Sequence, residues 1–321
     1  MKKTKRKFDI NKVKQFFLGN KEKKGFIKGF FLYLVLIGLA FVFLYPVLYM
    51  LVNSFFAPED LIDPSVTWIP TKFYLGNFVQ AYETLEFLSS FATSVVMAVV
   101  PSLLQLLATS LAAFGLARFE FPLKKLWLVL IIATFMIPTM VMTIPRYTMF
   151  FEYKMTETVL PFFIPAAFGQ GIRSTIFILI FYSFFSNYPI SFDEAAELDG
   201  AGKFKIYRKI AMPAASGAIV LCLLFSFVWY WNETTDLNLF SPNIKTLPKR
   251  LEEFAKKFSE LYGDSASSGS QQGGAANVVS RMNESLSLAG TLLSILPTVV
   301  LYLILQKQFV ESVERSGITG E

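Results

Sequence analysis

The chain has 321 residues, of which 54% are hydrophobic and 17% charged, and its mean hydropathy is +0.49. Soluble domains are less apolar and more charged, so this composition indicates a membrane protein. The absence of His and the single Cys222 exclude histidine metal sites, histidine acid–base catalysis and an internal disulfide.

The N-terminal residues 1–28 form a basic tail with 11 Lys and Arg residues and almost no apolar periodicity. Such a run could bind nucleic acid, but beside a membrane span it is more typical of a cytoplasmic segment near anionic lipid. We therefore predict membrane lipid as its partner and no nucleic acid. Residues 29–52 are uncharged and too long for the apolar part of a cleaved signal peptide, so they predict a first transmembrane helix.

Five further apolar runs predict membrane spans two to six, and the fourth is expected to extend back to Pro161 and to contain Arg173. With six spans both termini lie on one side, and placing them inside puts 20 of the 30 Lys and Arg residues inside, as the positive-inside rule expects. The runs are 87–117, 126–145, 174–192, 211–232 and 285–306. We predict a core over 87–306 and a second cytosolic tail over 307–321.

A charged stretch, residues 192–213, lies between spans four and five. Its first part, residues 192–198, is rich in Ala and Glu, and Asp199-Gly200 is a turn signal because Gly accepts a positive φ. Residues 203–210 have the composition of a second short helix. The pattern predicts a helix, an elbow and a second helix just outside the membrane.

Gly200-Ala201-Gly202-Lys203 is not a phosphate-binding loop, because Glu197 stands where the first Gly is required and Phe204 follows the Lys. We predict that this chain binds no cofactor. If ATP is hydrolysed, another chain does it.

A long external loop is expected over residues 233–284. Residues 247–258 have helical periodicity, with Leu251, Phe254, Ala255 and Phe258 on one side. Residues 265–276 are rich in Ser, Gly and Gln and predict a mobile strap.

Eight residues of the charged stretch resemble the EAA loop of ABC importer permeases. In that family the loop docks into a groove on a cytosolic ATPase subunit and carries its motion to the membrane. A bare triplet could equally be a solvated acidic helix, but the full spacing between two spans favours the resemblance. The matching residues are Glu194, Ala195, Ala196, Asp199, Gly200, Ala201, Ile210 and Pro213.

Weaker marks extend the resemblance from span one onward, and they are most similar to carbohydrate-uptake permeases of the maltose-transporter second-subunit type. They include Ala112–Phe119, Met136-Ile137-Pro138, Trp231-Asn232-Glu233 and Gln306–Val310. The resemblance implies an all-α, six-helix type I ABC importer (MetI-like) permease fold, an ABC transmembrane type-1 core and a bacterial plasma-membrane location with both termini cytoplasmic.

The resemblance also implies the partners. They are a second homologous permease, two ATPase subunits that bind ATP and Mg, an extracellular solute-binding protein and a sugar or oligosaccharide. A non-sugar solute such as a peptide is the alternative. A stand-alone secondary transporter is a further alternative, but the chain shows no internal repeat with paired broken helices.

Polar and aromatic residues inside the spans are candidates for the translocation pathway. A charge at membrane depth is costly unless it faces a cavity or a partner. Arg173 is therefore either a pathway residue that contacts substrate hydroxyls or an acid in the partner permease, or a structural residue that pairs between helices or snorkels outward. Gln105 and Gln170 are weaker candidates, because polar residues also join helices. Trp229 and Tyr230 could stack on a sugar or could belong to an interfacial aromatic belt.

Overall fold

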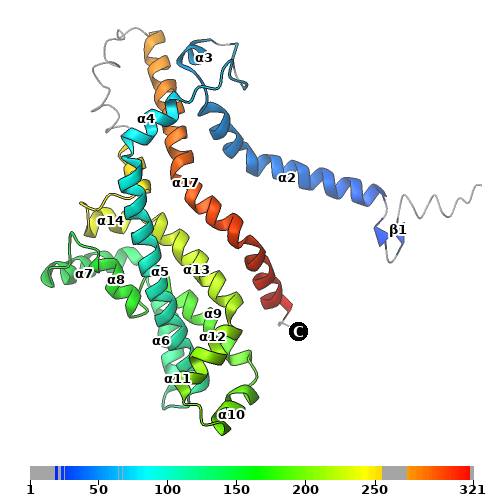
Figure 1. Cartoon of the computed structure of the whole chain (residues 1–321), viewed down its shortest axis with the longest axis vertical. Coiled ribbons are helices and arrows are strands. Elements are labelled where there is room, and N and C mark those ends of the chain that lie inside the picture. The colour runs from blue at the N-terminus through cyan, green and yellow to red at the C-terminus, as the bar shows by residue number, and fades with distance from the viewer. Residues whose placement is uncertain are drawn as a thin grey trace, which may run out of the picture.

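The computed structural model describes residues 19–20, 23–24, 26–63, 65–66, 68–254 and 273–318. Figure 1 shows a bundle of helices from which α2, Phe26–Asn53, extends to one side. The all-α expectation is confirmed, and the exception is a short ladder in which β1, Gly19–Asn20, pairs antiparallel with β2, Lys23–Lys24. The side chains of α2 are mostly exposed and apolar, so this helix requires lipid or another protein around it.

The next segments lie at the end of the bundle opposite the elbow. They are α3, Pro58–Ile62, and α4, Gly76–Thr84. Asn77 Nδ2 donates to the carbonyl oxygens of Ser54 and Phe56, at 3.0 Å each. This hydrogen bonding ties α4 to the chain that leaves α2.

Span two is confirmed as one continuous helix, α5, Phe87–Arg118, which runs the length of the bundle. Spans one and six also pass a length and hydropathy test for crossing a membrane, over Gly29–Asn53 and Glu284–Gln308. Pro101 lies within α5. In the part of the chain that the structure describes, up to six spans result when each of three bent pairs of helices counts as one span. The pairs are 124–136 with 139–152, 174–187 with 191–198, and 203–214 with 216–231.

The predicted third span is not one straight helix. It consists of α6, Lys124–Met136, and α7, Thr139–Glu152, which meet at 96°. Ile137 and Pro138 lie between them in an extended conformation. A proline disfavours a helical conformation at the residue before it and cannot supply a helical N–H. The segment to Pro145 therefore does not continue along the axis of α6.

The prediction that span four runs as one helix from Pro161 through Arg173 is also wrong. The structure has α8, Leu160–Ala167, a non-helical segment, and then α9, Ser174–Asn187. Gly169 and Arg173 both have a positive φ, of 70° and 51°. These left-handed residues interrupt the helix, so Arg173 precedes α9 instead of lying inside a helix.

Span five is shorter than predicted. Its long helix is α13, Ser216–Trp231, and it meets residues 203–214 at 80°. After it come α14, Thr235–Phe240, and α15, Leu247–Glu252. Leu247 and Phe254 are buried, so the predicted external helix is present, whereas residues 255–258 lie outside the described residues.

The last helix, α17, Gly273–Ile318, is much longer than the predicted sixth span. Residues 273–276, which we expected in a mobile strap, belong to this helix, and residues 265–272 lie outside the described residues. The part of this helix that is long and apolar enough to cross a membrane is Glu284–Gln308, so the helix begins within the predicted external loop and continues into the predicted C-terminal tail. Ala and Val follow the two glycines at its start, and these residues extend the helical pattern.

Two buried apolar clusters stabilise the bundle. The distal cluster lies away from the elbow and includes Phe150, Phe162, Trp231, Phe240 and Leu247. The elbow cluster joins α5, α9 and α13 to the charged stretch. Its fully or nearly fully buried members include Phe114, Phe177, Phe181, Phe185, Ile206, Tyr207 and Ala211.

Candidate functional site

The charged stretch forms the predicted elbow. The first helix is α10, Ser191–Leu198, and the second begins as α11, Lys203–Ile206. It continues as a π-helical turn, η1, Tyr207–Ala211, and as α12, Met212–Ala214. Figure 1 places α10 and α11 together at one end of the bundle. We refer to residues 191–214 as the elbow.

Gly200 sets the angle between the two halves of the elbow. Its φ is +75°, and a Cβ there would meet nothing within 4 Å. The requirement for glycine is therefore conformational and not steric, since the left-handed region is costly for residues with a Cβ. The turn is closed by backbone hydrogen bonds from Gly200 N to Glu197 O and from Ala201 N to Ala196 O, both 2.9 Å.

A buried ion pair anchors the elbow to span two. Arg118, the last residue of α5, lies 3.3 Å (Nε to Oδ2) from Asp193 in the first turn of α10, and the two side chains are 8% and 9% exposed. Each charge suits its helix end, because a cation is favourable at a C-terminus and an anion at an N-terminus. Arg118 also donates to the carbonyl of Tyr188 and lies 4.7 Å from the centre of its ring.

Burial raises the pKa of Asp193 above its ordinary value, whereas the charges of Arg118 and Lys203 act in the opposite direction. The charge of Arg118 is thus the largest effect that opposes the influence of burial on the pKa of Asp193. Removing Arg118 would leave an uncompensated charge in a buried position.

The second half of the elbow is also fastened to span two. The hydroxyl groups of Tyr207 and Ser110 are 2.8 Å apart in a buried hydrogen bond, and the ring of Phe114 lies 5.4 Å from that of Tyr207. Ile206 is fully buried and Ile210 packs against the same cluster. These contacts connect the second half of the elbow to α5.

The two alanines of the EAA triplet have different surroundings. Ala196 is buried in the elbow cluster, whereas Ala195 is exposed. Glu194, Asp199 and Pro213 are exposed as well. The triplet thus contributes one residue to internal packing and two to the free surface.

Sequence reasoning missed the apolar surface of the elbow. Leu198 is 91% exposed, and Phe192, Phe204 and Ile190 are more than half exposed. Each stands next to a charged or turn residue, and that mixed pattern would have been the signal in the sequence. It also missed the anchoring role of Arg118, because the two partners are 75 positions apart and no local pattern links them.

The pathway candidates fall into two groups. The guanidinium of Arg173 lies 4.8 Å from the centre of the Trp229 ring, and the ring is stacked between neighbours, with Phe177 at 5.3 Å and Phe225 at 5.6 Å. Arg173 is exposed, and it makes no ion pair within the part of the chain that the structure describes. Gln170 is exposed on the same non-helical segment.

Gln105 and Tyr230, by contrast, are buried, with exposed fractions of 0% and 5%. The Tyr230 hydroxyl donates to Gln105 Oε1 at 2.8 Å, and Gln105 Nε2 donates to the carbonyl of Ile172 at 2.8 Å. Their polar groups therefore face each other and the break in span four. In this conformation they do not offer those groups to a solute.

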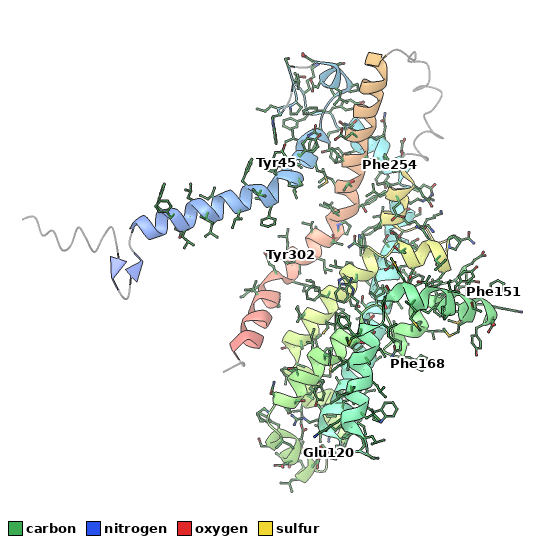
Figure 2. The ribbon with its side chains drawn as sticks, turned by 180° about the vertical axis from the view of Figure 1, so that it is seen from behind. Tyr45, Glu120, Phe151, Phe168, Phe254 and Tyr302 are labelled. Carbon is green, nitrogen blue, oxygen red and sulfur yellow. The ribbon has the colours of Figure 1, made fainter. Side chains whose placement is uncertain are left out.

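Figure 2, seen from behind, shows Glu120 near the elbow end of the bundle and Phe168 about halfway along it. Phe151 lies at the far tip of α7, outside the bundle, and Tyr302 lies on α17. Phe168 opens the non-helical segment that contains Arg173. The elbow and the candidate pathway residues are therefore separate sites, joined by α5, α9 and α13.

Known proteins resemble this chain over most of its length. The sequence model of the family described as "Binding-protein-dependent transport system inner membrane component" matches residues 105–315. The putative ABC transporter permease protein ORF2 of Caldicellulosiruptor sp. (strain Rt8B.4) is 31% identical over 66% of this chain and 77% of its own length. The melibiose/raffinose/stachyose import permease protein MelC of Bacillus subtilis (strain 168) is 29% identical over 80% of this chain and 86% of its own.

A solved structure has the same fold. It is the crystal structure of a bacterial ABC transporter involved in the import of the acidic polysaccharide alginate. One chain of it matches with a TM-score of 0.70 and 19% identity, and the match covers 88% of this chain and 96% of that chain.

Proposed function

The chain belongs to the family of binding-protein-dependent transport system inner membrane components, and we propose that it is a permease subunit of an ATP-driven ABC importer for a sugar or oligosaccharide. The family match covers most of the core, and the names of relatives such as MelC support a carbohydrate. The chain is thus a multi-pass membrane transport component.

The elbow is the observation that carries this proposal. Exposed apolar side chains outside a membrane mark a protein contact, and Leu198 and Phe204 lie on the same elbow as the exposed Glu194. We place this end of the bundle in the cytoplasm, where a separate ATPase subunit contacts it. That subunit binds ATP and Mg.

The buried contacts of the elbow suggest how ATPase movement reaches the pathway. The ion pair of Arg118 and Asp193 and the hydrogen bond of Tyr207 and Ser110 connect the elbow to α5. When two ATPase subunits close, they draw the elbows of this chain and of a second, homologous permease together. The packed helices follow, and the pathway opens to an extracellular binding protein.

The solute would pass the exposed Arg173 and the half-buried Trp229 beside it. Trp229 is held by aromatic neighbours, so its ring has a fixed direction, and a guanidinium supplies several hydrogen-bond donors for hydroxyl groups. Both termini would lie in the cytoplasm of a bacterial cell, and the basic N-terminal residues would lie near anionic lipid.

The direct test is purification of the tagged chain in mild detergent from its native membrane, followed by mass spectrometry. We expect an ATPase, a second six-span permease and a solute-binding protein. The variant Leu198→Asp should lose the ATPase and keep the second permease. Leu75→Asp is the matched control, because Leu75 is 62% exposed at the opposite end of the bundle. Recovery of the chain alone, with solute uptake that needs no ATP, would contradict the proposal and favour a secondary carrier.

A further inference from the structure

The break in span four leaves backbone groups of Ile172 without helical partners. In a regular helix the carbonyl of Ile172 would accept from the N–H of Ile176, but that N–H bonds to the carbonyl of Arg173 instead, at 3.0 Å. The N–H of Ile172 has no helical acceptor either, because α8 ends at Ala167. Both groups of this one peptide segment need partners from elsewhere.

The depth of Ile172 makes these partners necessary. Arg173 precedes the 14-residue α9, which puts it roughly 20 Å from the elbow end of that helix at 1.5 Å per residue. Gln105 on α5 and Tyr230 on α13 are 13 and 14 residues from their own elbow ends, and so they reach the same depth. Backbone groups packed between helices ~20 Å into a hydrocarbon core ~30 Å thick have no water to bond to if they are left unpaired.

Gln105 and Tyr230 supply both partners. Gln105 Nε2 donates to the Ile172 carbonyl at 2.8 Å, and the Ile172 N–H donates to the Tyr230 hydroxyl at 3.2 Å. The hydroxyl in turn donates to Gln105 Oε1 at 2.8 Å, which closes the network. Gly171 is required beside it, because a Cβ at this position would overlap with the Tyr230 hydroxyl and with Gln105 Oε1.

The network joins the chain neighbours of Arg173 and Trp229. Ile172 directly precedes Arg173, and Tyr230 directly follows Trp229. One set of hydrogen bonds therefore fixes the backbone on both sides of the cation–π contact. It also holds Arg173 at a φ of 51°, a conformation that a non-glycine residue keeps only when its surroundings impose it.

We propose that Gln105 and Tyr230 are positioning residues. They stabilise the non-helical segment of span four and keep Arg173 over Trp229 on the pathway side. They are not contacts for the solute themselves. The pathway role of Arg173 rests on the proposed import function, but the position of Arg173 does not, so the test measures that position directly.

The experiment uses a thiol at position 173 of the full chain in its native membrane. Arg173→Cys is treated with a water-soluble, membrane-impermeant maleimide, and its labelling rate is measured. The native chain is the control for background labelling, because its single cysteine, Cys222, is 1% exposed. The rate is then measured after adding Tyr230→Phe, which removes the hydroxyl from the network, or Gly171→Ala, which displaces it.

Tyr207→Phe is the matched control. Tyr207 and Tyr230 are buried to similar degrees, at 6% and 5% exposure, and each loses a buried hydroxyl group. We expect Tyr230→Phe and Gly171→Ala to change the labelling rate about fivefold or more. Tyr207→Phe should leave it within about twofold, although it lowers the thermal midpoint comparably.

Equal labelling rates in all four backgrounds would overturn the proposal, as would equal changes in the Tyr207 and Tyr230 variants. Either result would leave the proposed import function standing, because labelling needs no transport. Conversely, if purification finds no ATPase, the labelling result still decides whether the network positions Arg173. Gly171→Ala keeps the test decisive if Tyr230→Phe does not reach the membrane.

Discussion

The ion pair of Arg118 and Asp193 offers the sharpest test of how the elbow is held. We consider Asp193→Asn, which removes the charge and keeps the shape of the side chain. Arg118 would then remain buried with the carbonyl and ring of Tyr188 as its partners. The elbow should detach from α5 more often, because the bond that joins α10 to the end of span two is weakened.

The size of the effect follows from burial. Removing one partner of a buried ion pair costs about 3–5 kcal/mol. Because Arg118 keeps its contacts with Tyr188, we expect the lower part of that range or slightly less, about 2–3 kcal/mol. At 1.4 kcal/mol for each factor of ten, the detached population of α10 should rise about 30- to 140-fold.

Hydrogen exchange on the purified complex measures this population directly. The amides of residues 193–198 should exchange faster in Asp193→Asn by about the same factor. Glu197→Gln is the matched control, because Glu197 pairs with Lys203 on the same elbow but both side chains are about half exposed. An exposed pair contributes little, so exchange should change by less than about fivefold.

A double variant separates pairing from general damage. Replacing both residues by apolar ones, as in Arg118→Met with Asp193→Leu, removes the uncompensated charge and should recover most of the lost protection. If the two single effects simply add in the double variant, the residues do not act as a pair. If Asp193→Asn exchanges no faster than Glu197→Gln, the elbow is anchored by something else.

Three further outcomes are expected. Gly200→Ala should lower the free energy of unfolding by about 1 kcal/mol, because the φ of Gly200 is +75°. Gly202→Ala should not lower it, because the φ of Gly202 is −72°. Thermal unfolding of the complex distinguishes the two variants. Ser110→Ala should cost about 1 kcal/mol by the loss of the buried hydrogen bond to Tyr207, and Tyr207→Phe should add little to it in the double variant. Glu194→Lys should leave assembly detectable in the pull-down but reduce solute uptake per ATP hydrolysed, and full uptake at equal expression would show that Glu194 has no coupling role.

Much of the architecture was determined by local sequence. Long uncharged runs predict α5 and the membrane portion of α17 because burial in lipid requires about 20 apolar residues in succession, whatever the rest of the chain does. The elbow was predicted for a similar reason. Its helix-forming residues and its Gly200 turn depend on backbone preferences that neighbouring residues already express.

Hydropathy carries no information about the direction of the helix axis, and for this reason the sequence did not predict the bends. Residues 126–145 are apolar throughout, yet the chain turns by 96° at Pro138, and an apolar count is the same for a straight and a bent segment. The break before α9 has the same origin. Whether Gly169 adopts a positive φ or continues a helix depends on hydrogen-bond partners that other spans supply.

Only the tertiary structure decided which residues become these hydrogen-bond partners. Gln105, Ile172 and Tyr230 belong to three different spans. Arg118 and Asp193 likewise belong to two segments that are separated by the whole of spans three and four. Composition indicated that polar residues at membrane depth must be paired, because hydrocarbon offers no hydrogen bonds. Which groups pair is fixed by helix packing, which brings distant residues to the same depth and the same face.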